Sequence, residues 1–220
     1  MAWNYKKEVG RKAIHLFSLL FIFIYIIGAW LFGHRASLII LGVILTILIE
    51  MEYLRIEAKY KIPLLSKLWK YKRAKEKHRL GGEVFFLIGV IICLALLDFR
   101  IAVAAILMTT FGDLAAALIG RLGRIKILSF KTLEGILAEL IIDLFIGFLF
   151  VRELINGQVG WLSGNFTSAP IWPVIIVMAF TATIVETLVF KIDDNLLIPL
   201  FSGINGQIAM LVLNLVLVFI

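Results

Sequence analysis

Cysteine and histidine are scarce in this sequence, and each scarcity excludes a class of protein. The 220 residues include one cysteine, Cys93, so no disulfide can form within the chain. The three histidines, at positions 15, 34 and 78, stand alone, and no His/Cys cluster has zinc-ligand spacing. The sequence also lacks a G-x-x-x-x-G-K-[ST] phosphate loop and the H-R-D and D-F-G motifs of protein kinases. A disulfide scaffold, a structural zinc domain, a P-loop nucleotidase and a protein kinase are therefore excluded.

Apolar residues are what the chain has in abundance. Hydrophobic residues make up 62% of the sequence and charged residues 17%, whereas soluble domains are about 45–50% apolar. A length of 220 residues accommodates about six or seven membrane spans of ~20 residues each. No change of composition and no Pro/Gly/Ser-rich linker divides the chain. The sequence thus predicts a single all-α, polytopic membrane domain over residues 1–220.

Seven apolar stretches define the expected spans. The third is short for a hydrocarbon core of ~30 Å. The last is interrupted by "SGINGQ", residues 202–207, which predicts a broken or partly re-entrant helix. The stretches are Ala13–Phe32, Ala36–Tyr53, Val84–Leu97, Ile101–Leu122, Leu133–Val151, Ile171–Phe190 and Leu196–Ile220.

Lysine and arginine are distributed unevenly between the predicted loops. If the N-terminus is cytosolic and all seven stretches cross, 19 of the 22 Lys and Arg residues lie on the cytosolic side. The positive-inside rule therefore predicts a cytosolic N-terminus, and it explains the net charge of +7 without nucleic acid as a partner. Residues 55–80 hold ten of these basic residues, and a narrow apolar stripe there predicts an amphipathic helix on the inner leaflet. A solvated loop is the alternative for this segment.

Acidic residues inside or beside the predicted spans are the main functional signal. An Asp or Glu at mid-bilayer costs about 2.5–3.5 kcal/mol on insertion scales. Asp113, in "FGDLAAALIG", has a side chain too short to reach far towards water, which favours a polar or cation-binding pocket over a simple packing interface. Near the start of the last stretch, "ETLVFKIDDNLLIPL" contains Glu186, Asp193 and Asp194. Helix capping by Asn195 explains one polar residue at that boundary, not three acids.

A second motif, "KTLEGILAEL", opens the fifth stretch. Lys131, Glu134 and Gly135 lie in its first turns, where free backbone N–H groups and the helix dipole favour anions. The alternative is an ordinary cap by Thr132 followed by a first-turn glutamate. Both interpretations predict that the helix begins here.

A third motif, "KKEVGRKAIH", precedes the first stretch. Its polar residues at i, i+3, i+4 and i+7 share one helical face, although a basic flank that only sets topology is the alternative. Basic groups and helix N-termini bind phosphate, and clustered carboxylates hold Mg²⁺. Gathered at one side of a membrane, these groups indicate phosphoryl transfer from a metal–nucleotide complex to a lipid. The residues of this face are Glu8, Arg11, Lys12 and His15.

In order along the chain, "E-x-x-R-K-x-x-H", "GDLAAALIG", "KTLEG" and "E…IDDNLLIPL" resemble the motifs of the CTP-dependent lipid kinases. This group comprises dolichol kinase, phytol kinase and yeast-type diacylglycerol kinase. The segment "RLGGEVFFLIGVII" is similar to the third-span region of the group, and the resemblance runs from Glu8 to Pro199. It implies CTP as the donor and implies that Arg11, Lys12, Asp113 and Gly120 belong to the nucleotide-transfer site.

The expected activity is transfer of the γ-phosphate of CTP to the primary hydroxyl of a long-chain isoprenoid alcohol such as dolichol, polyprenol or geranylgeraniol. Diacylglycerol kinase and phosphatidate cytidylyltransferase are alternatives, although the H-G-G and D-R-x-D elements of the latter are missing. An ion-coupled transporter is a more distant alternative, disfavoured because the acids gather on one side. The expected location is a prokaryotic plasma membrane, or an ER-type membrane in a eukaryote, with the site facing the cytosol. The oligomeric state is left open.

These expectations assign a role to each candidate residue. The catalytic residues are Asp113, Glu134, Asp193 and Asp194. The Mg²⁺ ligands are Asp113, Glu186 and Asp194. The nucleotide- or phosphate-binding residues are Arg11, Lys12, Gly120, Lys131, Gly135 and Asn195, with Glu8 and His15 beside them.

Overall fold

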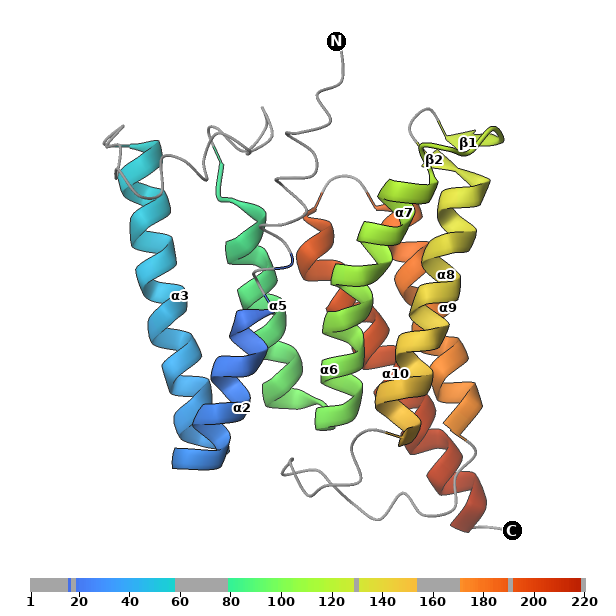
Figure 1. The fold of residues 1–220 in the computed structure, drawn as a ribbon. Coiled ribbons are helices and arrows are strands. Elements are labelled where there is room, and N and C mark those ends of the chain that lie inside the picture. The colour runs from blue at the N-terminus through green and yellow to red at the C-terminus, as the bar shows by residue number, and fades with distance from the viewer. Residues whose placement is uncertain are drawn as a thin grey trace. The chain divides into compact units, whose positions relative to one another are not determined.

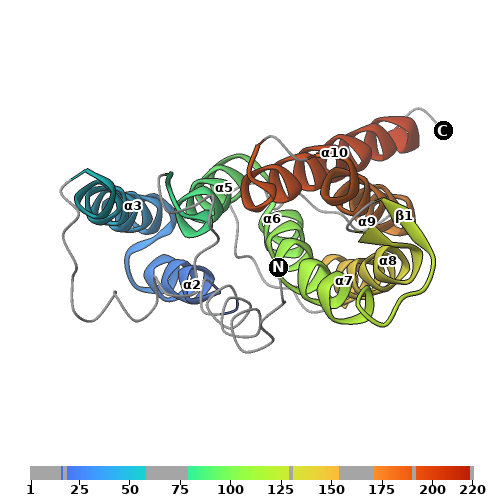
Figure 2. The same cartoon turned by 90° about the horizontal axis from the view of Figure 1, so that it is seen from above.

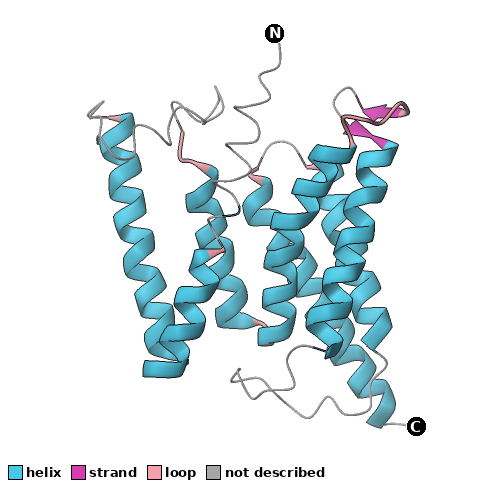
Figure 3. Cartoon of the chain, in the orientation of Figure 1, coloured by secondary structure: helices cyan, strands magenta, loops and turns pink. Residues whose placement is uncertain are grey.

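A computed structural model describes position 16 and residues 19–57, 79–128, 131–153, 171–189 and 192–218, with side chains as far as 213. These residues are almost entirely helical, which confirms the expected class (Figures 1 and 3). Two short strands, coloured magenta in Figure 3, were not predicted. The motif with Glu8, Arg11, Lys12 and His15 lies outside the described residues, as does most of the basic segment 55–80.

The chain divides into two compact units, Met1–Ile91 and Ile92–Ile220. That residues 1–220 form one domain stays a prediction.

The first unit contains a helical hairpin. Helix α2 (Leu20–Phe32) and helix α3 (His34–Ile56) pack against each other. Gly33 joins the two helices with φ at 86°, a backbone conformation that residues other than glycine rarely adopt. A hydrogen bond of 2.6 Å between Tyr25 Oη and His34 Nδ1 closes the turn.

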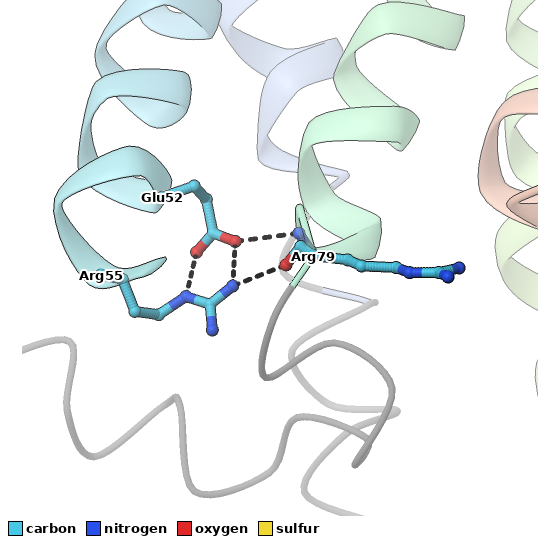
Figure 4. A network of polar contacts seen from close by, with 4 residues as sticks. Glu52, Arg55 and Arg79 are labelled. Carbon is cyan, nitrogen blue, oxygen red and sulfur yellow. Dashed lines mark hydrogen bonds and ion pairs between the residues drawn. The ribbon is translucent and has the colours of Figure 1, made fainter. Parts of the chain in front are cut away.

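A buried glutamate connects the end of α3 to the start of helix α5 (Gly82–Leu96), which spans the boundary between the units. The carboxylate of Glu52 accepts hydrogen bonds from Arg55 Nε at 3.0 Å, Arg55 Nη2 at 2.6 Å and the N–H of Gly81 at 2.9 Å. Arg55 Nη2 also donates to the carbonyl of Arg79 at 2.8 Å (Figure 4). Negative charge beside a helix N-terminus is favourable, so Glu52 stabilises both the ion pair and the entry to α5.

The second unit is a bundle of helices. Helix α9 packs on both α8 and α10, while α7 packs on α8 and α6 packs on α10 (Figure 2). Helix α6 is buried along its whole length. The elements are α6 (Phe99–Leu107), η2 (Met108–Gly112), α7 (Asp113–Ile119), β1 (Lys126–Leu128), β2 (Lys131–Thr132), α8 (Leu133–Gly147), η3 (Phe148–Glu153), α9 (Ile171–Leu188) and α10 (Asp194–Val218).

The span that carries Asp113 contains a π-helical turn. Segment η2 lies between α6 and α7 and ends at Gly112, directly before Asp113. The hydroxyls of Thr109 and Thr110 donate to carbonyls four residues earlier, at 2.9 and 3.2 Å. Single π turns within α-helices are frequent at functional sites. The hydrophobic pattern predicted a helix over this region but gave no sign of the π turn.

The prediction that residues 202–207 interrupt the last span is wrong, because α10 runs continuously through them. The glycines serve close packing: a Cβ built on Gly203 would lie 2.5 Å from Leu97 Cδ1, and one on Gly206 would clash with Met178. The polar side chains are satisfied within the unit, by bonds from Ser202 to the carbonyl of Ile198, from Asn205 to Thr181 and from the N–H of Asp98 to Gln207.

Several helices have the length and composition of membrane spans. Among the described residues four stretches qualify, namely His34–Ile56, Phe99–Ile119, Ile171–Leu188 and Asp194–Leu213, while α2 and α5 are apolar but shorter. An integral membrane protein is therefore confirmed. The count of seven spans and the cytosolic N-terminus stay predictions.

Candidate active site

The described candidate residues all belong to the second unit and lie near one of its ends. The end of α7, the β1–β2 hairpin, the start of α8, the end of α9 and the start of α10 all lie at this end of the unit (Figure 1). We call this region the hairpin end. Its parts are far apart in sequence, so tertiary packing assembles the site.

Two glycines predicted to bind nucleotide touch each other at the hairpin end. A Cβ built on Gly135 would lie 2.8 Å from Gly120 Cα, so α7 and α8 cross at this point with no space for a side chain. The hydroxyl of Thr132 donates to the carbonyl of Gly120 at 2.9 Å and accepts from the N–H of Gly135 at 3.3 Å. Thr132 therefore caps α8, as the simpler interpretation of its motif predicted. Contact of the two glycines with nucleotide stays a prediction.

Glu134 braces the loop that leads from α7 into β1. Its Oε1 accepts hydrogen bonds from the N–H groups of Arg124 at 2.7 Å and Ile125 at 3.2 Å. A Cβ built on Gly123 would lie 2.6 Å from Glu134 Oε2, so the loop closes tightly over the carboxylate. These contacts give Glu134 a structural role, and its catalytic role stays a prediction.

Lys131 and Glu186 form an ion pair across the hairpin end. Lys131 Nζ donates to Glu186 Oε1 at 2.8 Å and to the backbone carbonyl of Glu186 at 2.7 Å. The two side chains are 16% and 7% exposed. Glu186 lies in the last turn of α9, where carbonyls have no partner within the helix, so the ammonium also caps α9. Lys131, predicted to bind phosphate, and Glu186, predicted to bind Mg²⁺, are thus paired with each other.

The start of α10 is organised by Asp193. Its Oδ1 accepts from Asn195 Nδ2 at 2.8 Å and from the N–H of Asn195 at 3.2 Å. The N–H groups of Leu196 and Leu197 donate to the Asp193 carbonyl. Asp194 Oδ1 accepts from the N–H of Asn195 at 3.1 Å. The expectation that Asn195 caps the helix is wrong: Asp193 precedes α10, and Asn195 lies in its first turn.

The three predicted Mg²⁺ ligands do not form a ready-made metal site. Within the described part of the chain, no group of three or more His, Cys, Asp or Glu residues is arranged to hold a metal ion. Glu186 already pairs with Lys131, while Asp113 begins α7 and Asp194 begins α10, both partly exposed. Mg²⁺ in kinase sites commonly uses one or two carboxylates plus substrate phosphates. A role for Asp113 and Asp194 in holding Mg²⁺ stays a prediction.

Two buried acids in α8 were not among the predicted site residues. Glu139 is 1% exposed and Asp143 is not exposed at all. They lie four residues apart, on the same face of the helix. Their spacing inside an apolar stretch was a signal that the sequence carried, but it did not say that they face the inside of the bundle.

Comparison with known proteins supports the lipid-kinase interpretation. No protein-family profile and no solved structure matches the chain. An uncharacterized protein of Methanocaldococcus jannaschii is 31% identical over 208 residues, which cover 92% of this chain and 95% of that protein. This chain belongs to the same family. CTP-dependent diacylglycerol kinase 1 of Schizosaccharomyces pombe is 27% identical over 210 residues, covering 91% of this chain and 93% of the yeast protein. The chain is thus a distant homologue of a CTP-dependent lipid kinase.

Proposed function

We propose that this protein transfers the γ-phosphate of CTP to the primary hydroxyl of a long-chain isoprenoid alcohol in the membrane. The observation that carries the proposal is the match to a CTP-dependent lipid kinase along 91% of the chain. In the reaction the hydroxyl oxygen bonds to the γ-phosphorus, CDP leaves, and the hydroxyl proton is released. The helices of the second unit and the polar hairpin end suit an enzyme that joins a water-soluble donor to a lipid.

The hairpin end offers complementary groups for a magnesium nucleotide. The starts of α8 and α10 lie there, and helix N-termini favour phosphate. Asp113 and Asp194 would hold Mg²⁺ together with the phosphates of CTP, and the metal would neutralise the charge of the transferred group. Lys131 is engaged with Glu186, so Arg11 and Lys12 are the basic residues proposed to bind the donor phosphates.

The direct test is phosphate transfer by the purified protein in lipid nanodiscs. We expect label from γ-³²P-CTP in geranylgeranyl or dolichyl phosphate, with ATP a poor donor. The Asp113→Asn variant is the matched control for contaminating kinases. Label from α-³²P-CTP in the lipid would instead indicate a cytidylyltransferase, and no transfer to any lipid would contradict the proposal.

Diacylglycerol is a second candidate acceptor, because the yeast relative is named for that lipid. The same assay with dioleoylglycerol and geranylgeraniol at equal mole fraction separates the two. An isoprenoid preference of at least about tenfold in kcat/KM, or about 1.4 kcal/mol, supports the first candidate. The reverse preference supports the second.

The active site is proposed to face the cytosol of a prokaryotic cell, where CTP is available. Single cysteines replacing Lys126 at the hairpin and Leu162 between α9 and the preceding span test this orientation. A membrane-impermeant maleimide added to intact cells should label position 162 and not position 126. Labelling of position 126 from outside would reverse the proposed orientation.

A further inference from the structure

Buried polar atoms without a partner gather in one place. Among the residues that the structure describes, the buried side-chain oxygens and nitrogens with no hydrogen-bond partner all lie on α8 and α9, which pack together. Such atoms are rare in folded proteins because each loses its hydration without compensation, and each therefore needs an explanation. They are Glu139 Oε2, both carboxylate oxygens of Asp143, Glu186 Oε2 and Thr187 Oγ1.

The acids of this group form a cluster with one cation. The carboxylate of Glu139 lies close enough to Glu186, Asp143 and Lys131 for their charges to interact, and Asp143 interacts with Glu186 in the same way. Lys131 Nζ is bonded to Glu186 at the hairpin end, which leaves Glu139 and Asp143 deeper along α8. We call Glu139, Asp143 and Glu186 the acid cluster.

Tight packing closes the acid cluster on the side away from the hairpin end. A Cβ built on Gly147, one turn beyond Asp143, would lie 2.6 Å from Ile175 Cγ2 and 3.2 Å from Met108 Cε. Helices α8 and α9 and segment η2 therefore pack closely around Gly147, and no side chain would fit between them there. A ligand of the cluster therefore cannot reach it from the Gly147 side.

Asp143 lies directly beside the predicted phosphate-transfer residue. A Cβ built on Gly112 would lie 2.6 Å from Asp143 Oδ1, so the carboxylate rests against the backbone at the end of the π turn. The next residue is Asp113. The carboxylate of Asp143 thus contacts the residue that precedes Asp113, which is proposed to hold the Mg²⁺ of the nucleotide.

We propose that Asp143, assisted by Glu139, accepts a hydrogen bond from the hydroxyl group of the lipid acceptor and so holds it for transfer. The inference rests on the proposed function and adds the acceptor subsite to it. A hydroxyl supplies the donor that the carboxylate oxygens lack, and a lipid alcohol brings it through apolar surroundings. Because this subsite contacts only the hydroxyl group of the acceptor, it would bind an isoprenoid alcohol and a diacylglycerol alike.

Kinetics of Asp143→Asn test the subsite. The amide keeps the shape but is a weaker acceptor, so KM for geranylgeraniol should rise about tenfold. KM for CTP and the Mg²⁺ concentration for half activity should change less than twofold. Asp98→Asn is the matched control, since Asp98 is equally buried but bonded to the N–H and side chain of Arg100. A shift in Mg²⁺ requirement with unchanged lipid KM would show a cation site and overturn the proposal, as would unchanged kinetics.

A binding measurement separates this inference from the proposed function, because it needs neither CTP nor turnover. Geranylgeraniol should raise the thermal unfolding midpoint of the wild type more than its methyl ether, which has no hydroxyl donor. Asp143→Asn should lose this difference, and Glu139→Gln should reduce it. Equal effects of alcohol and ether on the wild type would overturn the inference even if both variants failed to fold. An inactive wild type that still distinguishes the two compounds would contradict only the proposed kinase activity.

Discussion

Glu52 and Asp143 are both buried acids, yet their surroundings differ in the one respect that separates a structural carboxylate from a binding one. Glu52, in the first unit, is 4% exposed and accepts three hydrogen bonds from Arg55 and Gly81. Asp143, in the second unit, is fully buried and accepts none. A satisfied carboxylate stabilises the fold, whereas an unsatisfied one destabilises it unless a ligand or proton completes it. Burial of an acid alone therefore does not indicate function; the state of its oxygens does.

The largest effect on stability is expected when the satisfied carboxylate is changed. Glu52→Gln removes the charge that neutralises the buried guanidinium of Arg55, whose side chain is 10% exposed. Breaking one side of a buried ion pair costs about 3 kcal/mol or more, so the thermal unfolding midpoint should fall clearly. Glu57→Gln, at an exposed position of the same helix end, is the control. An unchanged unfolding midpoint would show that Glu52 does not stabilise the fold.

Asp113→Asn should have the largest effect on catalysis. The substitution keeps the size of the side chain but removes the charge proposed to hold Mg²⁺. The rate of transfer from CTP should fall at least about a hundredfold, or about 2.7 kcal/mol, while the unfolding midpoint stays near that of the wild type. Activity within about threefold of wild type would make Asp113 a packing residue.

The Lys131–Glu186 pair lies between the two extremes, since Glu186 has one oxygen paired and one free. A double-mutant cycle with Lys131→Met and Glu186→Gln, read by thermal unfolding, should give a coupling energy of about 2 kcal/mol. A coupling near zero would mean that the pair does not hold the hairpin to α9.

The smallest effect is expected for the stability of Asp143→Asn. Replacing an unpartnered buried carboxylate by a neutral amide lowers its burial penalty, so the unfolding midpoint should stay constant or rise, by about 1 kcal/mol at most. The variant should therefore lose affinity for lipid without losing stability, which is the opposite of Glu52→Gln. A fall in stability as large as that of Glu52→Gln would show that Asp143 has a partner and end the distinction.

The sequence predicted what depends on local pattern. The apolar stretches correspond to the described helices within a few residues, as at Ile171, where α9 begins as expected. The start of α8 at "KTLEG" and the relationship to CTP-dependent lipid kinases were also predicted from short motifs. The structure confirms the start of α8, and the distant yeast homologue supports the relationship.

What the sequence could not predict depends on contacts between distant segments. "SGINGQ" resembles a helix break, but the neighbours of Gly203 and Gly206 turn it into a packing face. Glu52 accepts one of its hydrogen bonds from Gly81, 29 residues along the chain. The oxygens of Asp143 lack a partner because of how other helices pack around α8. The roles of the N-terminal motif lie outside the described residues and stay predictions.

The π turn before Asp113 has a consequence for how this span varies between related proteins. An α-helix advances by about 100° per residue, so one additional residue would rotate everything beyond it by that angle unless a widened π turn absorbs it. Helix α6 is buried on all sides, whereas α7 has no fully buried residue, and η2 lies where the two meet. The halves of the span therefore follow different helical phases and cannot be drawn on one helical wheel. Deleting a single residue between Met108 and Gly112 would convert the π turn into a regular α-helical turn and leave the carboxylate of Asp113 facing nearly the same neighbours.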